Sequence, residues 1–304
     1  MKIERAIKRK QKLRLGIMGA SGSGKTYSSL LLGLELGEKV CVIDTESGSA
    51  SLYADQFREY DTISLSPPFE PRRYVEAMKL IENTGYDVII IDSLTHEWSG
   101  VGGCLSMVDA ITKASSRGNS YTAWGKVTPE HNKLMEAILS SKCHVIATLR
   151  AKTAYDTVQV NGKMQPQKVG IEAVQREGME YEFTTLFSLT QNHSFTCSKD
   201  RTKIFDNPDI PELFTKDIAI KLLEWLNKGE ENIATEEFVD PPSLEDIFRE
   251  KASELFVKIR DGKIDKEKGA EDWHLLHSSA IIDNLPISIE METAFKNILT
   301  TKEN

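Results

Sequence analysis

Eight consecutive residues near the start of the chain, Gly19-Ala-Ser-Gly-Ser-Gly-Lys-Thr26, match the phosphate-binding pattern GxxxxGK[ST] in full. The apolar stretch LRLGIMG leads into them and a helix-forming stretch follows, which is the context that the pattern requires. Glycines allow a tight turn whose backbone N–H groups face phosphate oxygens, and the start of a helix adds favourable potential. In such a loop the lysine reaches the β- and γ-phosphates, and the hydroxyl ligates Mg²⁺. The residues therefore predict a site for a nucleoside triphosphate and Mg²⁺.

The predicted nucleotide contacts in this loop are Gly19, Ala20, Ser21, Gly22, Ser23, Gly24, Lys25, Thr26 and Tyr27. We expect Lys25 to act in catalysis as well, because its charge lies at the phosphates. The second half of the site follows in YDVIIIDSLTHEW, where Asp92 ends a continuous apolar run. A carboxylate at the end of a buried strand can hold the hydration shell of Mg²⁺. Thr26 and Asp92 are therefore the predicted metal ligands.

Hydrolysis also needs a group that orients and polarises the attacking water. AAA+ motors usually place a glutamate directly after the metal-site aspartate, but Ser93 stands there in this chain. Two candidates remain from the residues alone. Glu97 lies five residues past Asp92, and Glu46 ends the stretch KVCVIDTE.

Apolar stretches and helical patterns alternate from residue 13 to about 228. The predicted strands are LRLGIMG, KVCVIDTE, DTISLS, YDVIIID and HVIATLR, and the predicted helices cover residues 26–36, 71–85, about 127–141 and 215–229. Such alternation predicts an α/β fold with a doubly wound, mainly parallel sheet. After Arg150, alternating residues around Asn161-Gly162 predict an added antiparallel hairpin, and further strands follow.

Composition divides the chain further and excludes several classes of protein. We predict a basic arm at 1–12, the nucleotide-binding core at 13–229, an acidic linker at 230–242 and a small helical region at 243–304. The net charge of −8 excludes a strongly basic nucleic-acid coat, although a local basic groove stays open. The four cysteines are far apart, which favours a reducing, cytoplasmic setting. No apolar run has the length of a membrane span, so we expect no membrane partner.

Several of these motifs resemble the core of the RecA and RadA recombinases. VIDTE before a small-residue turn is similar to their catalytic segment, and IIIDS is similar to their metal-site strand. The resemblance implies that Glu46 is the general base and that Tyr53, seven residues on, stacks on adenine, so ATP is the expected nucleotide. Ala50 stands where the recombinases carry an acid. Their sensor glutamine after the next strand is replaced by Thr148 and Arg150, and Arg150 is either a sensor of the γ-phosphate or a surface charge.

The segment SKDRTKIF holds Lys199 and Arg201 in a K-x-R arrangement similar to that of RecA-type ring helicases. In those proteins the pair reaches from one subunit to the γ-phosphate of its neighbour. The resemblance therefore implies that Lys199 and Arg201 are catalytic and that the active protein is a homo-oligomer, either a ring or a filament. A basic hairpin tip is the alternative.

Taken together, residues 13–228 resemble the phage-encoded RecA-core ATPases of the Sak single-strand annealing type, also described as AAA-domain phage ATPases. GASGSGKT, IDTE, VIIIDSLTHEW, TLRAKTAY and EYEF before SKDR carry the resemblance in this order. It implies ATP-dependent work on single-stranded DNA in phage recombination or replication, in the cytoplasm of a bacterial host. Two segments with basic and aromatic residues suit such a strand. They hold Lys113, Arg117, Tyr121, Trp124 and Lys126 in one, and Arg150, Lys152, Tyr155, Lys163 and Lys168 in the other.

Two other classes of function remain open. The chain is an ATP-switched binding protein with little turnover if residues 243–304 dock a replication or single-strand-binding protein. It is a small-molecule kinase if it holds an acceptor pocket, but an Arg-rich lid, which such kinases usually carry, does not stand out in the sequence.

Overall fold

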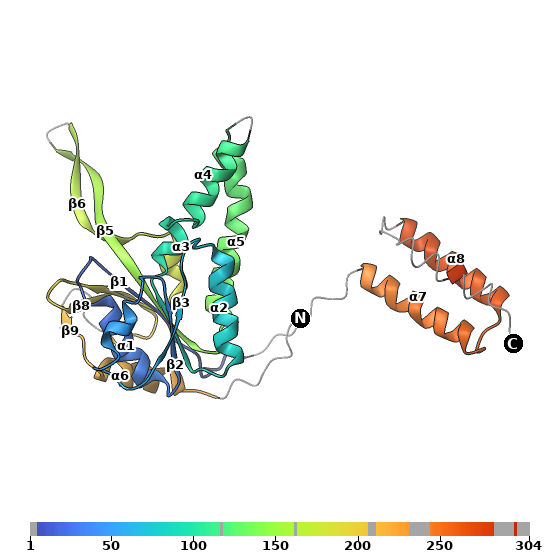
Figure 1. Cartoon of the computed structure of the whole chain (residues 1–304), viewed down its shortest axis with the longest axis horizontal. Helices are drawn as coiled ribbons and strands as arrows, with labels where there is room; N and C mark the ends of the chain where they lie inside the picture. The colour runs from blue at the N-terminus through green and yellow to red at the C-terminus, as the bar shows by residue number, and fades with distance from the viewer. Residues whose placement is uncertain are drawn as a thin grey trace. The chain divides into compact units, whose positions relative to one another are not determined.

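The structure is a computed structural model in which the chain forms two compact units, residues 1–232 and 233–304 (Figure 1). It describes residues 5–115, 118–160, 163–205, 211–230, 244–282 and 295–296. In the part that the structure describes, no helix is both long and apolar enough to cross a membrane.

A mixed sheet forms the centre of the first unit. Its strands are β1 (Arg14–Gly19), β2 (Val40–Asp44), β3 (Asp61–Ser64), β4 (Val88–Asp92), β5 (His144–Val160), β6 (Lys163–Ala173), β7 (Thr185–Leu189), β8 (Ser194–Asp200) and β9 (Glu212–Leu213). Their order is β3-β2-β4-β5-β1-β7-β8-β9, and β6 pairs with β5 outside this path. The pairings from β3 to β7 are parallel, whereas β6, β8 and β9 join antiparallel. The predicted α/β class, with its mainly parallel sheet and added antiparallel strands, is confirmed.

Helices cover both faces of this sheet. The helices α1 (Lys25–Leu36) and α6 (Asp217–Asn227) pack on one face, and α2 (Pro71–Asn83) and α5 (Ser120–Ser140) pack on the other. Side chains alternate accordingly along β4, where Ile90 belongs to the first core and Ile91 to the second. Because both faces are buried, the strand reads as one apolar run, and each fully buried isoleucine contributes about 1.5–3 kcal/mol.

The chain between β4 and β5 is more helical than the sequence predicted. We expected one helix over about 127–141, but α3 (Thr95–Ser99) and α4 (Cys104–Ala114) precede α5, which begins at Ser120. The two long helices form a helical arm whose small core includes Cys104, Val108, Ala123 and Val127. Trp124 also packs there, with its ring centroid 5.4 Å from that of Trp98. Trp124 is thus partly buried in the core of the arm, and its predicted role in base stacking stays a prediction.

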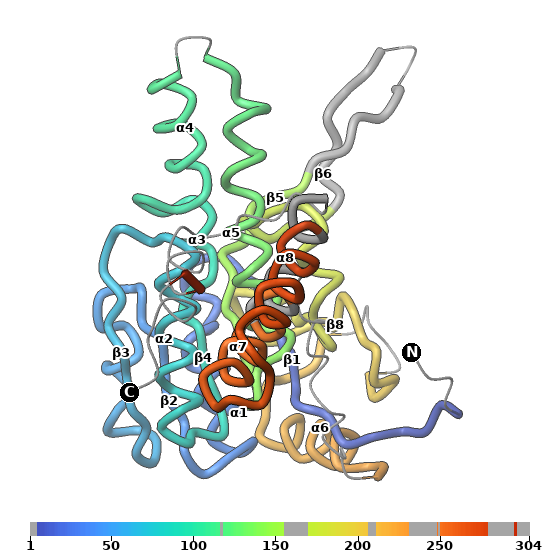
Figure 2. Tube along the Cα trace, turned by 90° about the vertical axis from the view of Figure 1, so that its right-hand side faces the viewer, coloured from blue at the N-terminus to red at the C-terminus, as the bar shows by residue number. Residues whose placement is uncertain are grey.

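The strand predicted at HVIATLR is also longer than expected. It continues past Arg150 as β5, and its second half pairs antiparallel with β6 to form a ribbon. The predicted Asn161-Gly162 turn lies outside the described residues, although Val160 and Lys163 on either side of it are paired. The ribbon and the helical arm leave the core at the same end of the sheet (Figure 1), and a second view shows the helical arm beyond the core again (Figure 2).

Residues 8–11 lie against α6 and the residues that follow it. Backbone N–H groups of Lys10 and Gln11 donate to Glu230 and Leu226, and the Lys8 ammonium sits 4.2 Å from the centroid of the Trp225 ring. A 3₁₀ turn (Ala50–Tyr53) follows β2, and another (Met179–Glu182) precedes β7. The predicted linker beyond residue 230 lies outside the described residues.

The second unit contains α7 (Leu244–Arg260) and α8 (Lys266–Ile282). Its core includes Phe248, Ala252, Leu255, Ile259, Trp273 and Phe295. The rings of Trp273 and Phe295 are stacked with centroids 4.6 Å apart, so aromatic packing holds the two helices and residue 295 together.

Candidate nucleotide site

The loop between β1 and α1 has the backbone geometry of a phosphate cradle. Gly22 and Gly24 have φ angles of 78° and 86°, a region that side-chain-bearing residues rarely adopt. A Cβ at Gly24 would also lie 3.0 Å from a ring nitrogen of His193. Lys25 Nζ donates to the Ala20 carbonyl at 2.9 Å, so the ammonium is held over the same loop. Nine of the ten residues predicted to contact the nucleotide lie at the end of β1, on this loop or in the first turn of α1, and Tyr53 lies in the 3₁₀ turn after β2.

Asp92 lies next to this loop at the end of β4. It is 1% exposed, and burial raises the pKa of its carboxyl group. Two hydroxyls donate to it: Thr26 Oγ1 to Oδ2 at 2.7 Å and Thr148 Oγ1 to Oδ1 at 2.5 Å. The structure thus brings Thr26 and Asp92, the two predicted metal ligands, into direct contact. A buried carboxylate whose pKa is raised by desolvation fits a cation, because a positive charge restores the solvation that burial removes.

Glu46 faces the loop from the turn after β2. Asp44 orders that turn, since its carboxylate accepts from the N–H of Glu46 at 2.7 Å and from that of Ala50 at 3.2 Å. The Glu46 carboxylate pairs with Arg150, whose Nη2 and Nε lie 2.9 and 3.1 Å from Oε1. Arg150 therefore lies at the candidate site, opposite the residue predicted as general base.

These side chains line one cavity of about 630 Å³. Its walls include Lys25 and Thr26 from α1, Glu46 from the turn after β2, Asp92 from β4 and Arg150 from β5. Burial lowers the pKa of the Lys25 ammonium, the charges of Glu46 and Asp92 raise it, and that of Arg150 lowers it. The mixed charges match a magnesium phosphate group, which presents both signs to the protein.

A second cavity of about 420 Å³ lies beside the first. The two share Gly22, Gly24 and Tyr53, so the loop and one aromatic residue separate them. The second is lined mainly by aromatic and apolar side chains: Tyr27, Leu31, Tyr53, His193 and Phe214. The rings of Tyr27 and Tyr53 meet edge to face with centroids 5.7 Å apart. Such walls suit a planar base, whereas the neighbouring polar cavity suits phosphates.

His193 and Phe214 were not found from the sequence. His193 belongs to the turn between β7 and β8, and its Nδ1 lies 3.3 Å from the Ser23 carbonyl. Its φ angle of 62° is unusual for a residue other than glycine. Sequence spacing gives no warning that this turn folds back on a loop 170 residues earlier.

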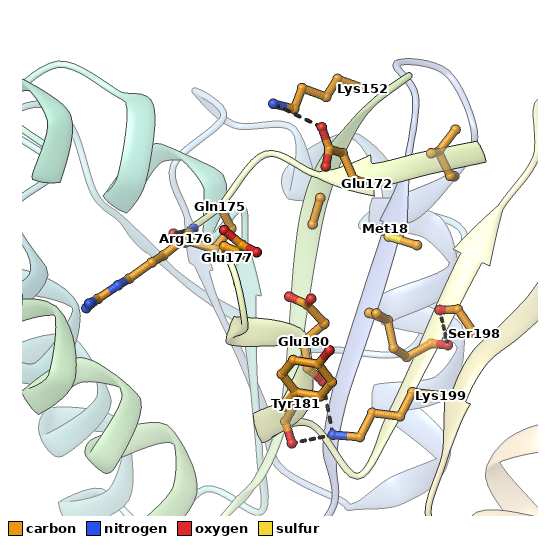
Figure 3. Close-up of a pocket in the computed structure, with 13 residues that line it drawn as sticks. Met18, Lys152, Glu172, Gln175, Arg176, Glu177, Glu180, Tyr181, Ser198 and Lys199 are labelled. Atoms are coloured by element: carbon orange, nitrogen blue, oxygen red, sulfur yellow. Dashed lines mark hydrogen bonds and ion pairs between the residues drawn. The ribbon is translucent and has the colours of Figure 1, made fainter. Parts of the chain in front are cut away.

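Lys199 and Arg201 lie at the opposite end of the sheet from the loop. Lys199 Nζ donates to the Glu180 carbonyl at 3.1 Å and to that of Tyr181, and Arg201 Nη2 donates to Tyr181 at 2.7 Å. Lys199 lines a separate cavity of about 790 Å³ with Met18 and Tyr181 (Figure 3). The structure does not bring this pair to the nucleotide site of its own chain.

Glu97, the other glutamate considered for water activation, does not line the nucleotide cavity. It is 0% exposed and its carboxylate is enclosed by side chains of Cys104, His131 and Gln175.

Among the predicted DNA contacts, Lys113 and Lys126 are exposed and Tyr121 is 85% exposed. Lys152 pairs with Glu172 at 3.1 Å. Arg117 and the side chains of Tyr155, Lys163 and Lys168 lie outside the described residues.

Residues 11–217 match a protein-family model described as an AAA domain. The match covers more than half of the 304 residues and includes the loop, Glu46, Asp92, Arg150 and the Lys199–Arg201 pair. No curated protein matches the chain significantly.

Replacing Thr148 with valine should destabilise the protein, because Asp92 Oδ1 loses a donor while the shape is kept. We expect the free energy of unfolding to fall by about 1.5–3 kcal/mol, the range for hydrogen bonds to charged groups. Thr185→Val is the matched control, since Thr185 is equally buried and its hydroxyl has no hydrogen-bond partner among the described residues. Denaturant titration of both variants measures the difference, and equal losses would contradict this account of Asp92.

Proposed function

The chain belongs to the AAA domain family, which indicates hydrolysis of a nucleoside triphosphate, and we propose that it is a Mg²⁺-dependent ATP hydrolase acting on single-stranded DNA. The observation that carries the hydrolase half is the convergence of Lys25, Thr26, Glu46 and Asp92 on one cavity. A neighbouring aromatic cavity, with Tyr27 and Tyr53 in its wall, supports a purine base such as adenine.

Each residue has a role that follows from its position. The backbone of the loop holds the phosphates, and Lys25 neutralises their negative charge. Thr26 and Asp92 would hold the metal, which supplies charge neutralisation at the reacting phosphate. Glu46 takes a proton from a water aligned on the far side of that phosphate. Arg150 leaves Glu46 and donates its N–H groups to the phosphate oxygens, which frees the carboxylate to act as base.

Glu46→Gln should remove hydrolysis while keeping nucleotide binding, because the amide cannot accept a proton. We expect the ATPase rate to fall by about 100-fold or more. Affinity for a nonhydrolysable ATP analogue should stay within about three-fold of the original protein. Glu59→Gln, a change at an exposed glutamate outside the cavity, is the control. An unchanged turnover number in Glu46→Gln would overturn the assignment of the base.

The single-stranded DNA half of the proposal is supported by the two projections at the nucleotide end of the sheet. The helical arm exposes Tyr121 together with Lys113 and Lys126, and an exposed ring with nearby cations suits stacked bases and phosphates. The resemblance to Sak-type phage ATPases agrees with this arrangement. The ribbon joins the same end through Arg150, at the nucleotide cavity.

Single-stranded DNA should therefore raise the ATPase rate, by about ten-fold at low salt, and the effect should weaken as salt rises. Oligo-dT in a steady-state ATPase assay measures the stimulation, and Tyr121→Ala should reduce it. ATP hydrolysis that is indifferent to oligo-dT at every salt concentration would refute the DNA half alone. The same assay on a chain that ends at Gly229 tests the role of residues 243–304. We propose that these residues bind a protein partner, so their removal should leave the stimulation by DNA unchanged.

We also propose that Lys199 and Arg201 act on the nucleotide of a neighbouring copy, which their distance from the same-chain loop supports. Arg201→Ala and Lys25→Ala should each be inactive. A mixture of the two should recover about a quarter of the original activity, because some interfaces combine an intact loop with an intact Arg201. A mixture as inactive as its components would refute the trans assignment.

A further inference from the structure

A buried carboxylate outside the nucleotide cavity connects the bases of both projections. Glu97 lies on α3, between the metal-site strand β4 and the helical arm. Its Oε1 lies 3.0 Å from Cys104 Sγ at the start of α4 and 3.0 Å from His131 Nδ1 on α5. Its Oε2 accepts from Gln175 Nε2 at 3.1 Å, just past the end of β6. One side chain thus joins α4, α5 and the segment that follows β6.

The same junction reaches the nucleotide site through the backbone. Gln175 Nε2 also donates to the Leu94 carbonyl at 3.2 Å, and the Leu94 N–H donates to the Thr148 carbonyl at 3.0 Å. Thr148 in turn donates through its hydroxyl to Asp92. The Arg150 N–H donates to Thr95 Oγ1 at 2.9 Å. Every step between Glu97 and the candidate metal ligand is therefore a hydrogen bond or a neighbouring residue.

Burial makes this junction stiff. Glu97 and Cys104 are 0% exposed and His131 is 3% exposed, so a broken bond would leave a buried polar group without water to replace it. Burial and the nearby carboxylate raise the pKa of the Cys104 thiol, so the thiol keeps its proton and donates a hydrogen bond to Glu97. The junction can change only by moving its segments together, which is how packed elements transmit small displacements.

We propose that Glu97 is a positioning residue that couples nucleotide occupancy to the order of the helical arm and the ribbon. The inference rests on the proposed nucleotide site but not on the identity of the polymer. Occupancy moves Asp92, Thr148 and Arg150, and Glu97 passes that movement to both projections at once. Binding on the projections then alters nucleotide affinity by the same factor, because coupling free energy is reciprocal.

Hydrogen exchange with and without a nonhydrolysable ATP analogue and Mg²⁺ tests this coupling. In the original protein we expect exchange to slow by about five-fold or more at the loop and at the bases of both projections. In Glu97→Gln the amide nitrogen faces donors instead of accepting from them. In this variant the slowing of hydrogen exchange should be confined to the loop, and the affinity for the analogue should stay within about three-fold of that of the original protein.

Two further variants make the test specific. Gln175→Ala keeps the buried carboxylate and also the 3.2 Å hydrogen bond from the Glu97 N–H to the Leu94 carbonyl. It should therefore uncouple the ribbon while the helical arm still responds, and it carries the test alone if Glu97→Gln does not fold. Glu172→Gln changes an exposed carboxylate at the base of the ribbon and should behave as the original protein does.

Four outcomes would overturn the proposal. Projections that respond equally in Glu97→Gln and the original protein would remove the role of Glu97, and projections that never respond would remove the coupling. Ligand atoms of Glu97, Cys104 and His131 lie within 4.8 Å of one another. A stoichiometric metal in the purified protein, lost in Cys104→Ala, would therefore make this a metal site instead. No response even at the loop would refute the nucleotide site and this coupling with it.

Discussion

Two threonine hydroxyls hold the Asp92 carboxylate, and the geometry of the candidate site depends on this interaction. Thr26 comes from the helix that follows the phosphate loop, and Thr148 comes from the strand between β1 and β4. The parallel register places Gly19 beside Arg150 and Asp44 beside Asp92, so three strand ends meet at one edge. Charged groups can converge there because each belongs to a strand whose position the buried sheet determines.

The sequence was sufficient for features that lie within one continuous stretch. The phosphate loop is a run of neighbouring residues between a strand and a helix, and Asp92 ends an unbroken apolar strand. These patterns depend on local backbone geometry and on burial of both faces of the sheet, which a single sequence displays directly. The α/β fold class followed from the same alternation of strands and helices.

Features that depend on long-range approach could not be predicted. His193 reaches the loop because β7 and β8 form a hairpin on the far side of β1, and local spacing does not encode that contact. For Glu97, in contrast, the position in the sequence suggested a role that its contacts do not support. Its position five residues after Asp92 made it a candidate for water activation, but a short helix turns its carboxylate towards Cys104 and His131. Trp124 has an aromatic ring of the kind that stacks on bases, but this ring packs against the small core of the helical arm.

Arg150 and Glu97 lie at the same end of the sheet, but they differ in whether the side chain can change its partners without a movement of the backbone. The Arg150–Glu46 pair is partly exposed, with side chains 51% and 27% accessible, and such pairs contribute only about 0–1 kcal/mol. The backbone of Arg150 is held independently by Thr95 and by the N–H of Val174. The guanidinium can therefore leave Glu46 by rotating its side chain, at little cost and without moving the strand. The Glu97 junction is buried and joins separate segments, so it responds only when backbone moves. Binding of a ligand that only turns the Arg150 side chain would have a local effect. Binding of a ligand that shifts Asp92 and Thr148 would also displace both projections.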